Sequence, residues 1–149
     1  MDIDNRLVID SRLEEIARAR DWLAERVSQA MLSRETVGDL KLALTEALSN
    51  VICHSYDSEP GHQIILSLFV DDKALTLTIR DFGRPFDASL YQMPDLDKLQ
   101  EGGYGVFLIQ SLMDQVRYDT SSGVGTTLTL VKQRDRQRSK KPGNYSASP

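Results

Sequence analysis

Apolar residues recur at helical spacing in two stretches of the N-terminal third of the chain. The first stretch contains Leu13, Ile16, Leu23, Val27 and Ala30, and the second contains Val37, Leu40, Leu44, Leu48 and Val51. Polar and charged residues occupy most positions between them. This pattern predicts two amphipathic helices that each bury one face in a core. Asp10 or Ser11 is expected to cap the first helix, and Ser33 the second.

Five other short stretches are rich in β-branched and aliphatic residues, and several of them alternate apolar with polar positions. They cover residues 5–9, 63–70, 74–80, 116–120 and 126–131. Short turns separate the second stretch from the third and the fourth from the fifth. Such turns join neighbouring antiparallel strands, so the pattern predicts two β-hairpins and one further strand.

A third, strongly apolar helix is predicted over residues 106–113, after a polar stretch without a clear period. The predicted order is therefore β-α-α-β-β-loop-α-β-β. Mostly antiparallel strands with helices on one face make an α+β fold, a two-layer sandwich. No repeat and no second domain is visible in the 149 residues, a length that suits one core.

Charge is distributed unevenly along the chain. From Lys132 onward, six Lys and Arg residues face one acidic residue, whereas residues 1–131 carry 12 basic and 21 acidic residues. An acidic body argues against a nucleic-acid-binding domain. We therefore divide the chain into a folded domain over 1–131 and a basic tail over 132–149, which is expected to be disordered.

The remaining composition indicates a cytoplasmic protein. Cys53 is the only cysteine, which excludes an internal disulfide framework and suits a reducing compartment. No apolar run approaches the roughly 18 residues of a membrane span. The first residues, MDIDNRLVID, lack the basic and apolar parts of a signal peptide.

The second helix carries a candidate chemical site. Glu46, Asn50 and His54 follow at intervals of four, so they share a face that is not the apolar one. A carboxylate and a carboxamide one turn apart can hold a hard cation and orient a water or hydroxyl. The alternative is an ordinary solvated helix edge, because polar pairs at this spacing are common.

Three further motifs follow in a definite order, each beside a predicted strand or helix. They are Asp81-x-Gly83, Gly103-x-Gly105 and Gly123-x-Gly125-Thr126. Glycines at the start of a helix let backbone N–H groups approach a phosphate. Taken singly, the aspartate could be a turn former and the last glycines ordinary hairpin residues. It is the joint order of all four motifs that points to one function.

This order resembles the ATP-binding superfamily of DNA gyrase B, heat-shock chaperones, MutL and sensor histidine kinases, whose domain has the left-handed Bergerat fold. Within it, the sequence is most similar to the small anti-sigma factor serine kinases of bacteria, the RsbW type. The phrases LTEALSNVICHSY, IRDFGRPFD and GGYGVFLIQSLMDQVRY carry the resemblance, which runs from about Leu13 to Val131.

The resemblance implies roles for individual residues. Glu46 would be the general base for the attacking hydroxyl, and Asn50 would hold Mg²⁺ beside the ATP phosphates. Asp81 would accept a hydrogen bond from the adenine amino group. Gly83 would let the base lie against the backbone, and Thr126 would support Asp81 or the adenine. No role follows for the neighbouring histidine at position 54.

The phosphate side of the implied site depends on Gly103 and Gly105, which would approach the phosphates, and on a basic residue in the preceding lid. Lys98 is the only basic residue there, among acidic neighbours that do little to stabilise a transferring phosphoryl group. Pro85 stands where the superfamily usually has a second glycine, and Val51 where it usually has a small residue. The weakly basic lid favours ATP binding over phosphotransfer.

Three functions fit these observations. The first is an anti-sigma factor that phosphorylates a serine of an antagonist with a STAS domain and so switches partners. The second is a non-enzymatic, nucleotide-gated binding module. The third is the ATP-binding half of a sensor histidine kinase, which fits poorly because the sequence shows no dimerisation helix with a phospho-accepting histidine. The resemblance also implies a sigma factor as partner and a homodimer, with no direct contact to nucleic acid or membrane.

Overall fold

The computed structural model of the chain describes residues 5–90 and 103–134. Within these ranges, no helix combines the length and apolar character needed to cross a membrane. Lys98 and the end of the basic tail lie outside the described residues.

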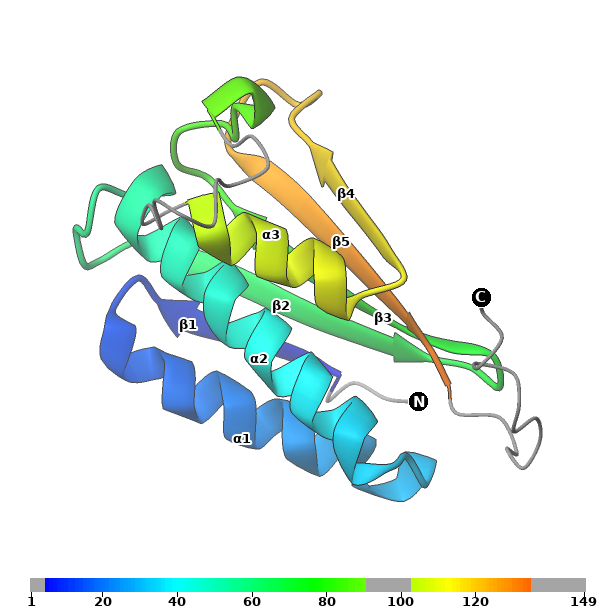
Figure 1. The fold of residues 1–149 in the computed structure, drawn as a ribbon. Helices are drawn as coiled ribbons and strands as arrows, with labels where there is room; N and C mark the ends of the chain where they lie inside the picture. The colour runs from blue at the N-terminus through cyan, green and yellow to red at the C-terminus, as the bar shows by residue number, and fades with distance from the viewer. Residues whose placement is uncertain (1–4, 91–102, 135–149) are drawn as a thin grey trace.

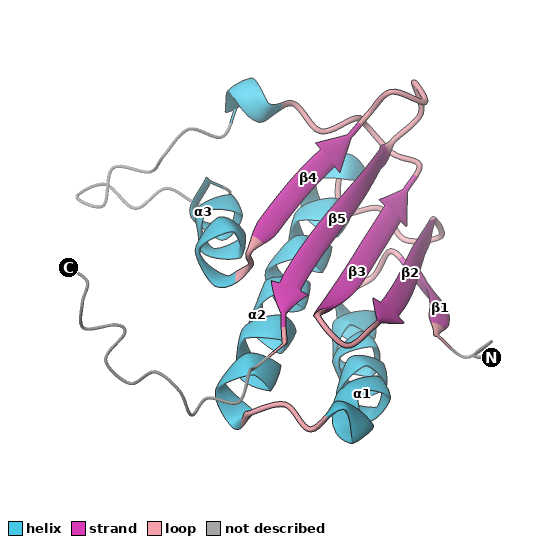
Figure 2. Cartoon of the chain, turned by 90° about the vertical axis from the view of Figure 1, so that its right-hand side faces the viewer, coloured by secondary structure: helices cyan, strands magenta, loops and turns pink. Residues whose placement is uncertain are grey.

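Five strands form one sheet in the order β1-β2-β3-β5-β4 (Figures 1 and 2). The strands are β1 (Arg6–Asp10), β2 (Gln63–Val70), β3 (Ala74–Asp81), β4 (Gln115–Asp119) and β5 (Thr126–Gln133). All four pairings are antiparallel. The predicted α+β sandwich and both predicted hairpins are thereby confirmed.

The three helices lie on one face of this sheet (Figure 2). They are α1 (Ile16–Val27), α2 (Arg34–Asn50) and α3 (Gly103–Leu112). Short helical turns extend them: η1 (Leu13–Glu15), η2 (Ser28–Ala30) and η3 (Val51–Ser55), while η4 (Ala88–Leu90) lies in the loop after β3.

The alternation along β3 explains why one face is covered. Ile79 pairs with Leu66 of β2 and Leu128 of β5, and all three side chains are buried. Thr78 points to the other face, which the helices leave uncovered.

The turn between β2 and β3 is held by the Asp71 side chain. Asp71 Oδ1 accepts the backbone N–H groups of Lys73 and Ala74, at 2.8 and 2.9 Å. Aspartate often closes a tight turn in this way.

Of the two helix caps predicted from the sequence, the structure confirms the one on α2 and contradicts the one on the first helix. The Ser33 cap is confirmed, because Thr36 N–H donates to Ser33 Oγ at 3.0 Å. The cap expected from Asp10 or Ser11 is wrong. Ser11 Oγ instead donates to the Glu59 carbonyl at 2.6 Å, and the Asp10 carboxylate accepts the Gly61 N–H. Both side chains therefore bind backbone groups of the 59–61 segment, about fifty positions away, and not the N–H groups at the start of the helix.

Two predicted boundaries differ from the observed ones by two residues or more. α3 begins at Gly103, so the glycines form its first turn instead of preceding it. β5 runs to Gln133, two residues into the segment assigned to the tail. Lys132 stays with the fold because its Nζ donates to the Leu112 carbonyl at 2.6 Å and lies 3.3 Å from Asp39 Oδ2. Its aliphatic stem can follow the strand while its charge reaches these oxygens.

Candidate functional site

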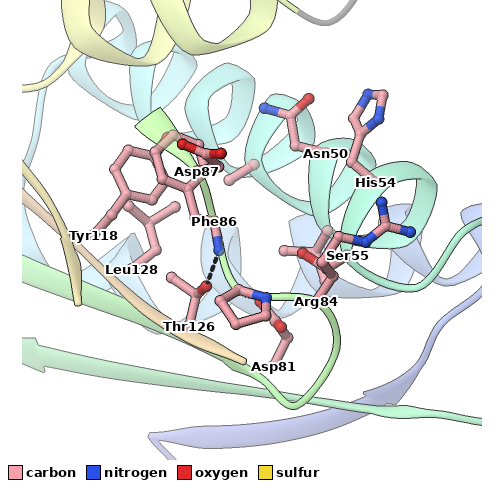
Figure 3. Close-up of a pocket in the computed structure, with 13 residues that line it drawn as sticks. Asn50, His54, Ser55, Asp81, Arg84, Phe86, Asp87, Tyr118, Thr126 and Leu128 are labelled. Carbon is pink, nitrogen blue, oxygen red and sulfur yellow. Dashed lines mark hydrogen bonds between the residues drawn. The ribbon is translucent and has the colours of Figure 1, made fainter. Parts of the chain in front are cut away.

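The C-terminal end of α2 changes its helical winding where the candidate residues lie. The helix is regular to Asn50 and then continues as the single π-helical turn η3 (Val51–Ser55). Such turns are rare and occur frequently at functional sites. Asn50 and His54, two of the three residues predicted to share a helix face, both line one pocket despite the change in winding (Figure 3). Glu46, the third, is not among the residues that line it.

This pocket has a volume of about 290 Å³, near the lower end of the roughly 300–1,000 Å³ typical of small-ligand sites. It lies between α2 with η3, the loop after β3, and the strands β4 and β5. Its lining combines apolar and polar side chains from these elements: Ala47, Asn50, Val51, His54, Ser55, Asp81, Arg84, Pro85, Phe86, Asp87, Tyr118, Thr126 and Leu128. A flat apolar ligand with a few polar groups suits such a lining.

Phe86 and Tyr118 form one wall of the pocket. Their rings are stacked, with centroids 3.7 Å apart and an angle of 7° between the planes. Neither residue was among the predicted site residues. Phe86 lies in a loop without a periodic pattern, but Tyr118 follows Val116 at strand spacing on the inward face of β4. That alternation was the available signal for Tyr118.

Asp81 is a carboxylate buried at the end of β3, with 2% of its surface exposed. Burial raises the pKa of Asp81 above its ordinary value, while the Gly83 N–H, the charge of Arg80 and the Thr126 backbone oppose the shift. The Gly83 N–H donates to Asp81 Oδ1 at 3.0 Å. The pocket thus contains a poorly hydrated, oriented hydrogen-bond acceptor.

Replacing Asp81 with asparagine is expected to raise the thermal unfolding midpoint of the ligand-free protein near neutral pH. A raised folded-state pKa means that the ionised carboxylate is less favourable in the folded protein than in the unfolded chain. Asparagine removes that charge and keeps an oxygen for the Gly83 N–H. The advantage of the variant should shrink as the pH falls through the folded-state pKa, because Asp81 is then neutral too.

Asp71→Asn is the matched control for this prediction. Asp71 is exposed, and two backbone N–H groups lower its pKa, so its charge stabilises the fold above its unfolded-state pKa. Its loss should lower the midpoint at neutral pH. Thermal unfolding at neutral and mildly acidic pH measures both variants, and a lower midpoint for Asp81→Asn at neutral pH would contradict the prediction.

Two glycines are required because backbone segments cross at the pocket. A Cβ atom on Gly83 would lie 2.3 Å from the Ser55 carbonyl oxygen, and one on Gly125 would lie 2.0 Å from the Asp81 carbonyl oxygen. Gly125 also has a φ of 66°, which L-residues rarely adopt. Arg84 N–H donates to the same Ser55 oxygen at 2.8 Å. The loop after β3 is therefore held directly against η3.

Glu46 and Asn50 meet the first turn of α3. A Cβ atom on Gly105 would lie 2.8 Å from Glu46 Oε1 and 3.5 Å from Asn50 Oδ1. A side chain at position 105 would displace the Glu46 carboxylate, so glycine lets the α3 backbone approach both side chains as they lie. The structure therefore brings together three residues that are separated by almost sixty positions in the sequence. Gly103 opens the same turn.

Thr126 holds the loop after β3 on its other side. It is 3% exposed and pairs with Asp81 across β3 and β5. Its Oγ1 accepts the Phe86 N–H at 2.9 Å, the dashed line in Figure 3. Thr126 thus supports the pocket through both its strand register and its side chain.

Metal ligands are sparse in this region. Among the described residues, no three His, Cys, Asp or Glu side chains gather as a cation site. A divalent cation with few protein ligands would take its other positions from water and ligand phosphates, which is how Mg²⁺ is usually bound. The Asn50 side-chain oxygen, beside Gly105, fits that arrangement.

Comparisons with known proteins identify the family of the chain. Residues 9–132 match the family described as "Histidine kinase-like ATPase domain". A serine-protein kinase RsbW from Oceanobacillus iheyensis is 30% identical over 124 residues, which cover 78% of each chain. Its counterpart from Bacillus pumilus is 34% identical over 113 residues, 68% of this chain and 69% of the relative.

Solved structures support the fold. The RsbU and RsbW domains of a Mycobacterium tuberculosis protein superpose with a TM-score of 0.64 at 18% identity. The match covers 88% of this chain and 33% of that longer chain. The mycobacterial sensor histidine kinase MprB gives a TM-score of 0.52 at 16% identity, with 87% and 97% covered. On this fold, pocket and sequence similarity, the chain belongs to the histidine kinase-like ATPase family and, within it, to the RsbW-type serine-protein kinases.

Proposed function

We propose that this protein binds Mg-ATP, phosphorylates a serine of an anti-sigma factor antagonist with a STAS domain, and binds a sigma factor when the antagonist is phosphorylated. One observation carries the proposal. Glu46 and Asn50 meet the glycine-opened turn of α3 beside a pocket that also contains the buried Asp81. In Figure 3, Asn50 and Asp81 lie on opposite sides of this pocket.

The base of the nucleotide would occupy the Asp81 side. An ionised Asp81 can accept a hydrogen bond from the adenine 6-amino group, and its burial keeps water from competing. Phe86, Tyr118 and Leu128 supply apolar surface for a planar ring. The close approach of Gly83 to Ser55 brings the loop that follows Asp81 against η3 on this side of the pocket.

The phosphates would lie beside the first turn of α3, where helix N–H groups and the helix dipole favour negative charge. Asn50 would hold Mg²⁺ through its side-chain oxygen. When bound, Mg²⁺ neutralises charge on the phosphate oxygens. Gly103 and Gly105 add no side chains of their own to this turn, so the backbone at these two positions can approach the nucleotide.

Glu46 would act as the general base. It would take the proton of the attacking serine hydroxyl as the serine oxygen bonds to the γ-phosphorus and the bond from the γ-phosphorus to the β–γ bridging oxygen breaks. The products are phosphoserine and ADP. Glu46 is half-buried and lies beside Gly105, next to the turn where the phosphates are proposed to bind, which suits a base that must meet the serine hydroxyl there.

A second candidate function is a nucleotide-gated binding module without phosphotransfer. Arg84 is the only Lys or Arg among the pocket-lining residues that the structure describes. It is ion-paired with Asp57, so part of its charge is already neutralised. Little described positive charge thus remains to stabilise a transferring phosphoryl group. Lys98, proposed to contribute to nucleotide binding, lies outside the described residues.

The proposed partners follow from membership of the RsbW-type family. We propose a sigma factor and a STAS-domain antagonist as alternating partners, and a homodimer as the working state. Light scattering of the purified protein tests the dimer, and co-elution with either partner in the presence of ATP or ADP tests the exchange.

Intact-mass spectrometry tests the central activity. A candidate STAS-domain antagonist is incubated with this protein and Mg-ATP, and its mass is measured over time. One added phosphoryl group, absent when ATP is replaced by a non-hydrolysable analogue, is the expected result. An unmodified antagonist that demonstrably binds this protein, in a preparation that also binds ATP, would instead favour the binding module.

A further inference from the structure

Tyr56 connects three elements around the pocket without lining it. It follows η3 directly and is 6% exposed. Its hydroxyl donates to the Gln63 carbonyl at the start of β2 and accepts the Phe82 N–H just after β3, both at 2.7 Å. One buried hydroxyl therefore ties the end of α2 to the beginning of β2 and to the loop that contains Asp81.

The position of these bonds gives the hydroxyl a specific role. Asp81 is the last residue of β3 that pairs with β2 and β5. The Phe82 N–H lies one residue beyond that pairing, and Tyr56 supplies its acceptor. The next N–H, from Gly83, donates to Asp81 Oδ1. The hydroxyl thus orients the chain between the end of the sheet and the N–H that holds the carboxylate.

The protonation state of Tyr56 suits both bonds. Burial raises the pKa of Tyr56, so the hydroxyl keeps its proton at neutral pH and can donate while it accepts. Its ring is stacked on His62, with centroids 4.6 Å apart and an angle of 9°. The backbone N–H of Tyr56 donates to the Val51 carbonyl at 3.0 Å. The side chain therefore has little freedom to turn away from Phe82.

We propose that Tyr56 is a positioning residue for adenine recognition, because its hydroxyl fixes the Phe82 amide and thereby the direction in which Asp81 presents its carboxylate. This inference rests on the proposed function, in which Asp81 accepts the adenine 6-amino group. Tyr56 acts through Asp81 and does not touch the nucleotide. Removal of the Tyr56 hydroxyl should therefore weaken recognition of the adenine 6-amino group more than it weakens nucleotide binding in general.

A matched pair of variants separates positioning from simple stability. Tyr56→Phe removes one buried hydroxyl and two hydrogen bonds. Ser11→Ala does the same on the other side of the 56–63 loop, where Ser11 Oγ donates to the Glu59 carbonyl and accepts the His62 N–H. Ser11 is 1% exposed, and neither of these two hydrogen bonds reaches the loop after β3. Both variants should lower the unfolding midpoint.

The readout is the ratio of the dissociation constants of purine riboside triphosphate, which lacks the 6-amino group, and ATP. The wild-type protein should prefer ATP by about tenfold or more, since a hydrogen bond to a charged acceptor is lost with the analogue. Tyr56→Phe should reduce this ratio severalfold toward one. Ser11→Ala should leave it unchanged, and Tyr56→Phe should add little to Asp81→Asn in the double variant.

The outcomes distinguish the two hypotheses. A wild-type ratio near one would overturn the adenine role of Asp81 and this inference with it. A high wild-type ratio that Tyr56→Phe leaves intact would overturn the inference alone. If Tyr56→Phe does not fold, hydrogen exchange of the wild-type Phe82 amide decides: strong protection supports the inference, and exchange at the rate of an exposed amide overturns it.

Discussion

Glu46→Gln is expected to reduce phosphoryl transfer about 10²- to 10⁴-fold, the usual contribution of a general base. Glutamine has the same shape as glutamate, so it fits beside Gly105, but it cannot take the proton of the serine hydroxyl. Affinity for Mg-ATP should change little, because the proposed role of Glu46 is in the transition state. The rate at which the antagonist gains a phosphoryl group, with ATP affinity measured separately, tests both statements.

Glu35→Gln is the matched control. Glu35 is exposed in the first turn of the same helix α2, far from the end that carries the site. The Glu35→Gln variant should phosphorylate the antagonist at the wild-type rate. If Glu46→Gln kept that rate as well, another group would have to be the base. If it lost ATP affinity in proportion to its rate, Glu46 would be a ligand-binding residue instead.

Gly83→Ala is expected to weaken ATP binding about a hundredfold, since displacements of about 1 Å in a site can have effects of that size. The new Cβ would lie 2.3 Å from the Ser55 carbonyl oxygen and 2.9 Å from Tyr56 Cδ1. Neither contact is possible, so the loop after β3 must move away from η3. The hydrogen bond from Arg84 N–H to Ser55 and the orientation of Asp81 would change with it.

Gly38→Ala provides the control for this glycine. A Cβ atom on Gly38, within α2, would have no atom within 4 Å. Alanine there should raise the free energy of unfolding by about 0.5–1 kcal/mol, because it restricts the unfolded chain and favours helix. Isothermal titration with ATP and thermal unfolding measure both variants. Wild-type affinity in Gly83→Ala would show that the loop does not need its contact with η3.

Much of the architecture follows from local pattern. The alternation around Leu77 and Ile79 predicted a strand with one buried face, and β3 has that face. The Ser33 cap and the stripe through Leu40 and Leu44 predicted α2. The spacing of Glu46 and Asn50 predicted that they share a helix face, and both adjoin Gly105 in the structure. Each of these features depends on residues only a few positions apart, so it can be predicted from the sequence without knowledge of the fold.

Other features depend on segments that meet only in the folded chain. Asp10 and Ser11 have the side chains of helix caps, yet they bind the 59–62 loop because β1 pairs with β2 and brings that loop to them. No local pattern distinguished Tyr56 or Phe86 from other aromatic residues, since their partners lie 26 and 40 positions away.

The same distinction applies to the glycines. Their motif spacing was visible in the sequence, but the reason that Gly83 and Gly125 must be glycine was not. Each is required because another backbone segment passes within 2.3 Å of where its Cβ would be. Local pattern thus predicts the elements, their order and the residue types of the site. Which hydroxyls, amides and glycines hold the Asp81 loop in place depends on the folded chain, because long-range packing creates those contacts.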